Sequence, residues 1–179
     1  MEEALSYPGK IGDESRRFLR GRAIAGWALI CLIAVGLFSA EVGAPLLRWS
    51  GHTNLAAIIY GAFSHVCHQM ASRSFHIEGY PMAVCARCTG IYGGFALVAL
   101  FYPLAASFRR PLLLSRIWLF LAAIPLAVDF LVGFLNIWEN TAWSRFSTGF
   151  LLGGVASLYV VSGAVEIAQS MTVRPKLFR

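Results

Sequence analysis

The sequence predicts an all-α integral membrane protein with four transmembrane helices and one short interfacial helix. Of its 179 residues, 58% are hydrophobic and only 13% are charged, about half the charged share that is typical of soluble domains. The apolar residues gather in long runs, and about 20 of them suffice to span a bilayer. A soluble chain of this length could not bury so much apolar surface in its core.

The first expected span covers residues 23–47 and follows a basic leader, residues 1–22. Only Glu41 is charged within this span. A cleaved signal peptide is the alternative interpretation, because Val42 and Ala44 are small enough to form a cleavage site. The apolar run is too long and the polar leader too extended for a signal peptide, so we expect a retained membrane anchor.

A shorter apolar stretch, residues 52–66, is marginal for spanning and predicts an interfacial helix. A polar loop follows over residues 67–81. Three further spans complete a single membrane domain over residues 23–169. We expect them at about residues 85–107, 112–135 and 143–169, followed by a basic tail over residues 170–179.

The distribution of Lys and Arg predicts the orientation of the four spans. The leader, the loop between the second and third spans, and the tail hold eleven of the fifteen basic residues, and cytoplasmic segments are enriched in these residues. We therefore expect the cytoplasmic membrane, with both termini in the cytoplasm. The eleven are Lys10, Arg16, Arg17, Arg20, Arg22, Arg109, Arg110, Arg116, Arg174, Lys176 and Arg179.

The net charge of +6 does not indicate nucleic acid as a partner, because no basic stripe is interleaved with aromatic residues for stacking on bases. The expected partner is the lipid bilayer. Gly149 and Gly153 form a GxxxG pattern, which lets helix backbones approach closely. This pattern favours packing within the bundle, and it is also a possible contact with another membrane protein.

The expected topology brings Cys67, His68, Cys85 and Cys88 together on the outer side of the membrane. Cys85 and Cys88 are three residues apart at the start of the second span, so both sulfurs can lie on one helix face. A helix N-terminus also favours thiolates, the form that binds metals or exchanges disulfides. Three sulfurs and one nitrogen suit tetrahedral zinc, and the leading hypothesis is a zinc site with these four ligands.

Adjacent residues on a regular helix point about 100° apart, so Cys67 and His68 can share one ion only where the chain is irregular. Otherwise His65 or His76 would supply the nitrogen.

A thiol–disulfide oxidoreductase that uses Cys85 and Cys88 with a quinone is the second hypothesis. A non-catalytic subunit of a membrane complex is the third. Buried cysteines that only pack as small apolar residues are the plainest alternative, and packing is the expected role of Cys31.

Asp129 lies within the third span, where a carboxylate costs about 2.5–3.5 kcal/mol on insertion scales and therefore needs a partner. Arg145, at the start of the fourth span, is the expected partner in an ion pair. Alternatively, Arg73, Arg87 and Arg145 form one polar pocket with Asp129 that binds an anion, a lipid headgroup or a quinone carbonyl. Asp129, Arg145 and Arg87 are the candidate catalytic residues, with Asp129 a possible general base if the metal has an open position.

Two blocks of the sequence resemble a known family. The first block reads Cys67-His68-Gln69, then Arg73-Ser74-Phe75, then Val84-Cys85-Ala86-Arg87-Cys88-Thr89-Gly90-Ile91-Tyr92 and Gly94. The second comprises Pro125, Asp129, Arg145, Thr148, Gly149 and Gly153. Over about residues 60–155 the chain resembles the prokaryotic membrane proteins described as domain of unknown function 2085. The resemblance implies a small polytopic membrane protein in which these residues are grouped, and it implies no particular activity.

Overall fold

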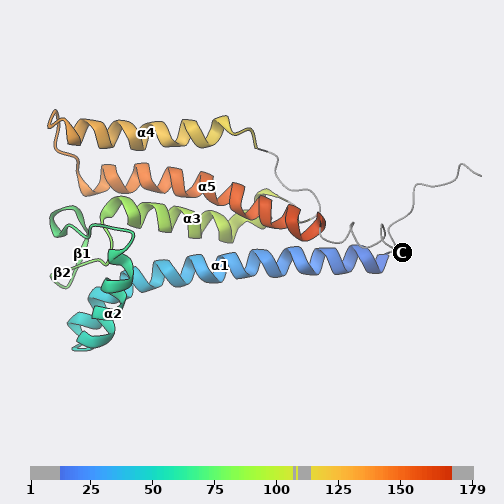
Figure 1. The fold of residues 1–179 in the computed structure, drawn as a ribbon, viewed down its shortest axis with the longest axis horizontal. Coiled ribbons are helices and arrows are strands. Elements are labelled where there is room, and N and C mark those ends of the chain that lie inside the picture. The colour runs from blue at the N-terminus through green and yellow to red at the C-terminus, as the bar shows by residue number, and fades with distance from the viewer. Residues whose placement is uncertain (1–12, 107, 109–113, 171–179) are drawn as a thin grey trace, which may run out of the picture.

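Four long helices run side by side along the longest axis of the molecule, as the computed structural model shows (Figure 1). A short helix, α2, and a small hairpin lie together at one end, which we call the hairpin end. The structure describes residues 13–106, 108 and 114–170. The long helices are α1 (Asp13–Trp49), α3 (Ala86–Ala105), α4 (Ile117–Phe134) and α5 (Ala142–Ser170).

Six of the eleven basic residues that predict the orientation lie outside the described residues. Lys10, Arg109 and Arg110 lie outside the described residues, as does the tail from residue 171 onward. Of the expected leader, residues 13–22 are helical and continue α1, so this helix begins before the expected residue 23.

Three helices of the described chain are long and apolar enough to cross a membrane. They cover Arg17–Trp49, Ile117–Phe134 and Ala142–Ala168. These match the expected first, third and fourth spans. The expected second span corresponds to α3, whose apolar residues are interrupted by Arg87 and by several glycines. A span at α3 therefore stays a prediction.

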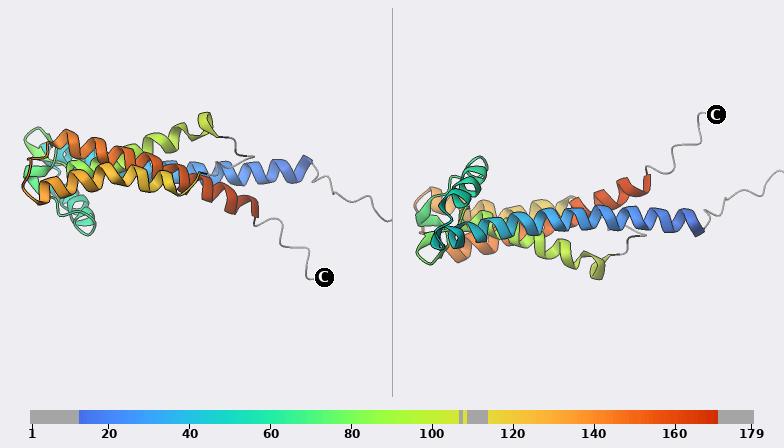
Figure 2. Two further views of the ribbon diagram at one scale, coloured as in Figure 1. Left: turned by 90° about the horizontal axis from the view of Figure 1, so that it is seen from above. Right: turned by 90° about the horizontal axis from the view of Figure 1, so that it is seen from below.

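The short helix expected over residues 52–66 is observed as α2 (Thr53–Ser64), which leaves the bundle axis at the hairpin end (Figure 2), and its interfacial position stays a prediction. The segment after α2, which was expected to be a loop, contains regular secondary structure. It contains a 3-10 helix, η1 (Ala71–Arg73), and two short antiparallel strands, β1 (His76–Ile77) and β2 (Tyr80–Pro81). The turn between the strands has positive φ angles at both central residues, Glu78 and Gly79, as a type I′ hairpin turn requires.

Helices α3 and α5 form the closest pair in the bundle. A Cβ atom added at Gly149 would collide with the backbone oxygen of Arg87, and one added at Gly153 would collide with that of Ile91. Gly94 on α3 approaches the α5 backbone in the same way. The GxxxG face is therefore covered within the chain by α3, so it is not free for the contact with another membrane protein that the sequence suggested.

Buried side chains form two clusters, one at each end of the bundle. The cluster at the hairpin end contains Ala44, Phe63, Cys67, Ala83 and Val84, and it joins α1, α2 and the segment before α3. Many large apolar side chains of the long helices are exposed instead. An extended exposed apolar surface is what a lipid-facing bundle requires.

Candidate metal centre

Three cysteines meet at the hairpin end. The sulfurs of Cys67, Cys85 and Cys88 all lie within 4.8 Å of one another. Cys67 follows α2, Cys85 is the N-cap residue of α3, and Cys88 lies in the first turn of that helix. The expected sharing of one site by Cys85 and Cys88 is thus what the helix geometry produces, and all three thiols are free.

Hydrogen bonds hold the two cysteine segments together. The backbone N–H of Cys85 donates to the sulfur of Cys67 at 3.2 Å. Gln69, with a φ of 50°, turns its amide nitrogen back to donate to the carbonyl oxygens of Tyr60, at 2.7 Å, and Ala83, at 2.8 Å. One side chain therefore ties the end of α2 to the segment that leads into α3, which fixes the positions of the sulfurs.

The surroundings of Cys85 favour its thiolate. This residue precedes the first residue of α3, and the pKa of its thiol is lowered to about 5. The largest cause is the hydrogen bond from the Cys88 side chain, and backbone hydrogen bonds from Cys88 and Arg87 act in the same direction, while burial opposes them. A thiolate is both a metal ligand and a nucleophile, so the thiolate form of Cys85 suits either metal binding or disulfide exchange.

His68 does not lie within the group of three sulfurs. Its neighbour Cys67 is buried and faces the other two cysteines, whereas His68 is exposed, as expected for adjacent side chains that point apart. His65 and His76 are not in the group either. The structure therefore brings together three of the four expected ligands.

A cavity of about 360 Å³ lies against the sulfurs. Its walls come from the segment after α2 and from α3, α4 and α5, and it contains all three of the arginines that the sequence placed in a polar pocket. The lining residues are Val66, Cys67, His68, Gln69, Met70, Arg73, Cys85, Arg87, Cys88, Phe130 and Arg145.

Asp129 forms its ion pair with Arg87 rather than with the expected Arg145. Arg87 stands at the start of α3, and its guanidinium reaches α4 and lies 5.7 Å from the centroid of the Phe130 ring. The second carboxylate oxygen of Asp129 accepts a hydrogen bond from Ser144 Oγ at 2.9 Å. Both oxygens are thus engaged by side chains of the described residues, and the general-base role of Asp129 stays a prediction.

The sequence analysis did not include Glu41 among the candidate site residues. Its side chain is fully buried on α1 at the hairpin end, and neither carboxylate oxygen has a hydrogen-bond partner among the described residues. The backbone oxygen of Glu41 accepts a hydrogen bond from Ala83 N–H at 3.3 Å, next to the cysteine segment. The available signal was one acidic residue in a long apolar run, because ionisable residues at membrane depth are functional candidates by default.

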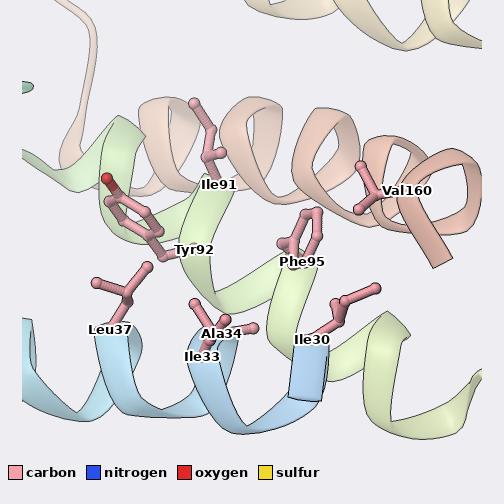
Figure 3. Close-up of a pocket in the computed structure, with 8 residues that line it drawn as sticks. All are labelled: Ile30, Ile33, Ala34, Leu37, Ile91, Tyr92, Phe95 and Val160. Atoms are coloured by element: carbon pink, nitrogen blue, oxygen red, sulfur yellow. The ribbon is translucent and has the colours of Figure 1, made fainter. Parts of the chain in front are cut away.

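A second cavity, of about 330 Å³, lies between α1 and α3 with one contribution from α5 (Figure 3). Its lining is apolar except for the Tyr92 hydroxyl, so it offers contacts for a hydrocarbon chain rather than groups for chemistry. The lining residues are Ile30, Ile33, Ala34, Leu37, Ile91, Tyr92, Phe95 and Val160.

Comparisons with known proteins agree with the membrane character of the chain. Residues 67–159 match a family model described as "Predicted membrane protein (DUF2085)". An uncharacterized protein of Methanocaldococcus jannaschii is 34% identical over 139 residues, which cover 74% of this chain and 89% of the relative. An uncharacterized protein of Methanothermobacter thermautotrophicus is 34% identical over 98 residues, which cover 54% and 86%. No solved structure gives a significant match.

Proposed function

The chain belongs to the family of predicted membrane proteins described as DUF2085, and we propose that it binds one zinc ion through Cys67, Cys85 and Cys88. The observation that carries this proposal is the approach of the three sulfurs to within 4.8 Å of one another. Zinc–sulfur bonds of about 2.3 Å in tetrahedral geometry place sulfurs about 3.8 Å apart, so only small side-chain movements would be needed.

The three sulfurs leave one position of a tetrahedral ion to be filled from the adjoining cavity. His68 lines that cavity and would fill the position after a side-chain rotation, which would make the site structural. Without His68, a water molecule would complete the coordination, as in catalytic zinc sites, where bound water becomes more acidic. The cavity beside the sulfurs favours this second arrangement, because it gives a small molecule room to approach.

The proposal places this site at the outer face of the cytoplasmic membrane. Helix α3 would be a fourth span, and its close packing against α5 supports this role. Both termini would then lie in the cytoplasm, at the end of the bundle opposite the cysteines. A membrane-impermeant thiol reagent should label Cys85, which is only half-buried and lines the cavity, in intact, chelator-treated cells, and labelling only after the cells are permeabilised would overturn this orientation.

A thiol–disulfide oxidoreductase is the second candidate, and the lowered pKa of Cys85 favours it. Oxidation of Cys85 and Cys88 to a disulfide would release two protons and two electrons, and a quinone would accept both to form a quinol. The third candidate, a non-catalytic subunit, has less support, because α3 already covers the glycine face of α5.

Metal and thiol contents measured on the same gently purified sample test the proposal. We expect one zinc per chain, and four thiols that react after denaturation with a chelator, since all four cysteines are free. The Cys88→Ser variant should lose the zinc. Cys31→Ser is the matched control and should retain it, because Cys31 is buried in the other cluster of the bundle. Absence of metal, with two thiols recovered only after reduction, would overturn the zinc site and favour the oxidoreductase, and quinone reduction would then be the next assay.

A further inference from the structure

Three arginine side chains line the cavity beside the cysteines. Arg73, Arg87 and Arg145 reach it from η1, α3 and α5. Among the described residues, Arg87 is the only one of the three with an ion pair, which it forms with Asp129. Arg73 and Arg145 form no ion pair in this part of the chain, although Asp129 and the Cys85 thiolate attract the Arg145 guanidinium.

Two of these arginines also have unsatisfied N–H groups. The Nε atoms of Arg87 and Arg145 are buried, and neither has a hydrogen-bond acceptor among the described residues. A buried donor without an acceptor is destabilising, and more so when it carries charge. Both Nε atoms are enclosed by protein, so a ligand in the cavity meets the outer guanidinium nitrogens first and reaches an Nε only after the side chain turns.

We propose that this cavity binds a phosphate group, held by Arg73, Arg87 and Arg145. Guanidinium groups present paired N–H donors in a fixed fork that matches the oxygens of a phosphate. A phosphate monoester, which carries about −1.5 to −2 near neutral pH, has enough oxygens and charge to engage several guanidinium groups at once. None of the three arginines is a metal ligand, so the phosphate site goes beyond the zinc site and does not depend on it.

The other walls of the cavity indicate what could be attached to the phosphate. Val66, Met70 and Phe130 line the same cavity and are exposed apolar side chains. A volume of about 360 Å³ falls in the range of small-molecule sites and leaves room beyond the phosphate. A phospholipid headgroup would use both the arginines and the apolar wall, whereas free phosphate from water would use only the arginines.

Calorimetric titration of the full chain in detergent separates these two sources. The probes are inorganic phosphate, dihexanoyl phosphatidic acid and dihexanoylglycerol, which has the same chains and no phosphate. Saturable binding of phosphatidic acid, without binding of dihexanoylglycerol, is the expected result. Binding of inorganic phosphate with similar affinity would identify free phosphate as sufficient, and binding of phosphatidic acid alone would identify a lipid. If neither phosphate compound binds, the proposal is wrong.

Arg145→Gln is the decisive variant, because it removes a cavity charge without breaking an ion pair of the described residues. It should weaken phosphate binding at least about tenfold, the effect of losing a charge-assisted hydrogen bond. Arg48→Gln is the matched control: Arg48 lies at the same end, over the Tyr80 ring at 5.3 Å, outside the cavity, and should leave binding unchanged. Equal weakening by both substitutions would overturn the proposal, because it would indicate only general attraction by positive charge.

Two controls test whether a change in phosphate binding comes from the arginine site itself. Thermal unfolding of each variant checks that a loss of binding does not come from a loss of folding. Titration of protein that has been stripped of metal with a chelator separates this proposal from the zinc site. Phosphate binding should persist in the stripped protein, so that failure of one site can be told from failure of the other.

Discussion

A single methyl group added at Gly149 should destabilise the bundle. In the native arrangement a Cβ atom at this position would collide with the backbone oxygen of Arg87, and a backbone atom cannot rotate away as a side chain can. Helices α3 and α5 would have to separate. Forcing extra atoms into a well-packed interface costs about 1–3 kcal/mol.

Gly163→Ala is the matched control for this effect, because Gly163 lies on the same helix and an added Cβ meets nothing within 4 Å. Replacing glycine by alanine inside a helix stabilises it by about 0.5–1 kcal/mol. Since both variants gain this term, the difference between their free energies of unfolding isolates the collision. We expect Gly149→Ala to be less stable than Gly163→Ala by about 1–3 kcal/mol.

The assay is reversible unfolding in mixed micelles with increasing sodium dodecyl sulfate, followed by tryptophan fluorescence. A second measurement is the zinc content of both variants, because the start of α3 carries Arg87 and the neighbouring Cys88. Gly149→Ala should bind zinc more weakly, while Gly163→Ala should bind it normally. Equal stabilities of the two variants would refute the close packing of α3 and α5 described here.

Two further results are expected. Asp129→Asn should lower the free energy of unfolding by about 1–3 kcal/mol, since it leaves the partly buried Arg87 charge without its partner. The control Glu139→Gln changes an exposed residue and should alter the free energy of unfolding by less than about 0.5 kcal/mol. Equal effects of the two substitutions in the same unfolding assay would contradict the pairing. Acidification should release the zinc, because protons compete with metal for thiolates; elemental analysis after dialysis at decreasing pH checks this, and zinc content that does not change with pH would exclude cysteine ligation.

The helical class could be predicted from the sequence because long apolar runs have few alternatives in a chain of this composition. The short helix at residues 52–66 was also predictable, since its length distinguishes it from a span, and it is observed as Thr53–Ser64. The small hairpin was not predicted. Its strands are two residues each, which is too short to show an alternation of apolar and polar residues in the sequence.

The candidate site was predictable only in part. The spacing of Cys85 and Cys88 predicts a shared helix face, and that geometry is local. Ion pairing is not local: Asp129 pairs with Arg87, 42 residues away, rather than with the nearer Arg145, because the packing of α3 and α5 decides which guanidinium reaches α4. The hydrogen bond from Ala83 N–H to the backbone oxygen of Glu41 likewise joins distant segments, and no pattern within the first span could reveal it.

The pairing of α3 with α5 has a consequence for the order in which the protein is built. The whole of α4 lies between these helices in the sequence, so the glycine face of α3 stays uncovered until α5 has been synthesised. Arg87 can pair with Asp129 as soon as α4 has been synthesised, so the late step is the covering of the glycine face. We therefore expect nascent chains that end before α5 to be substrates for membrane chaperones and quality-control proteases, and α5 to be the segment whose arrival completes the bundle.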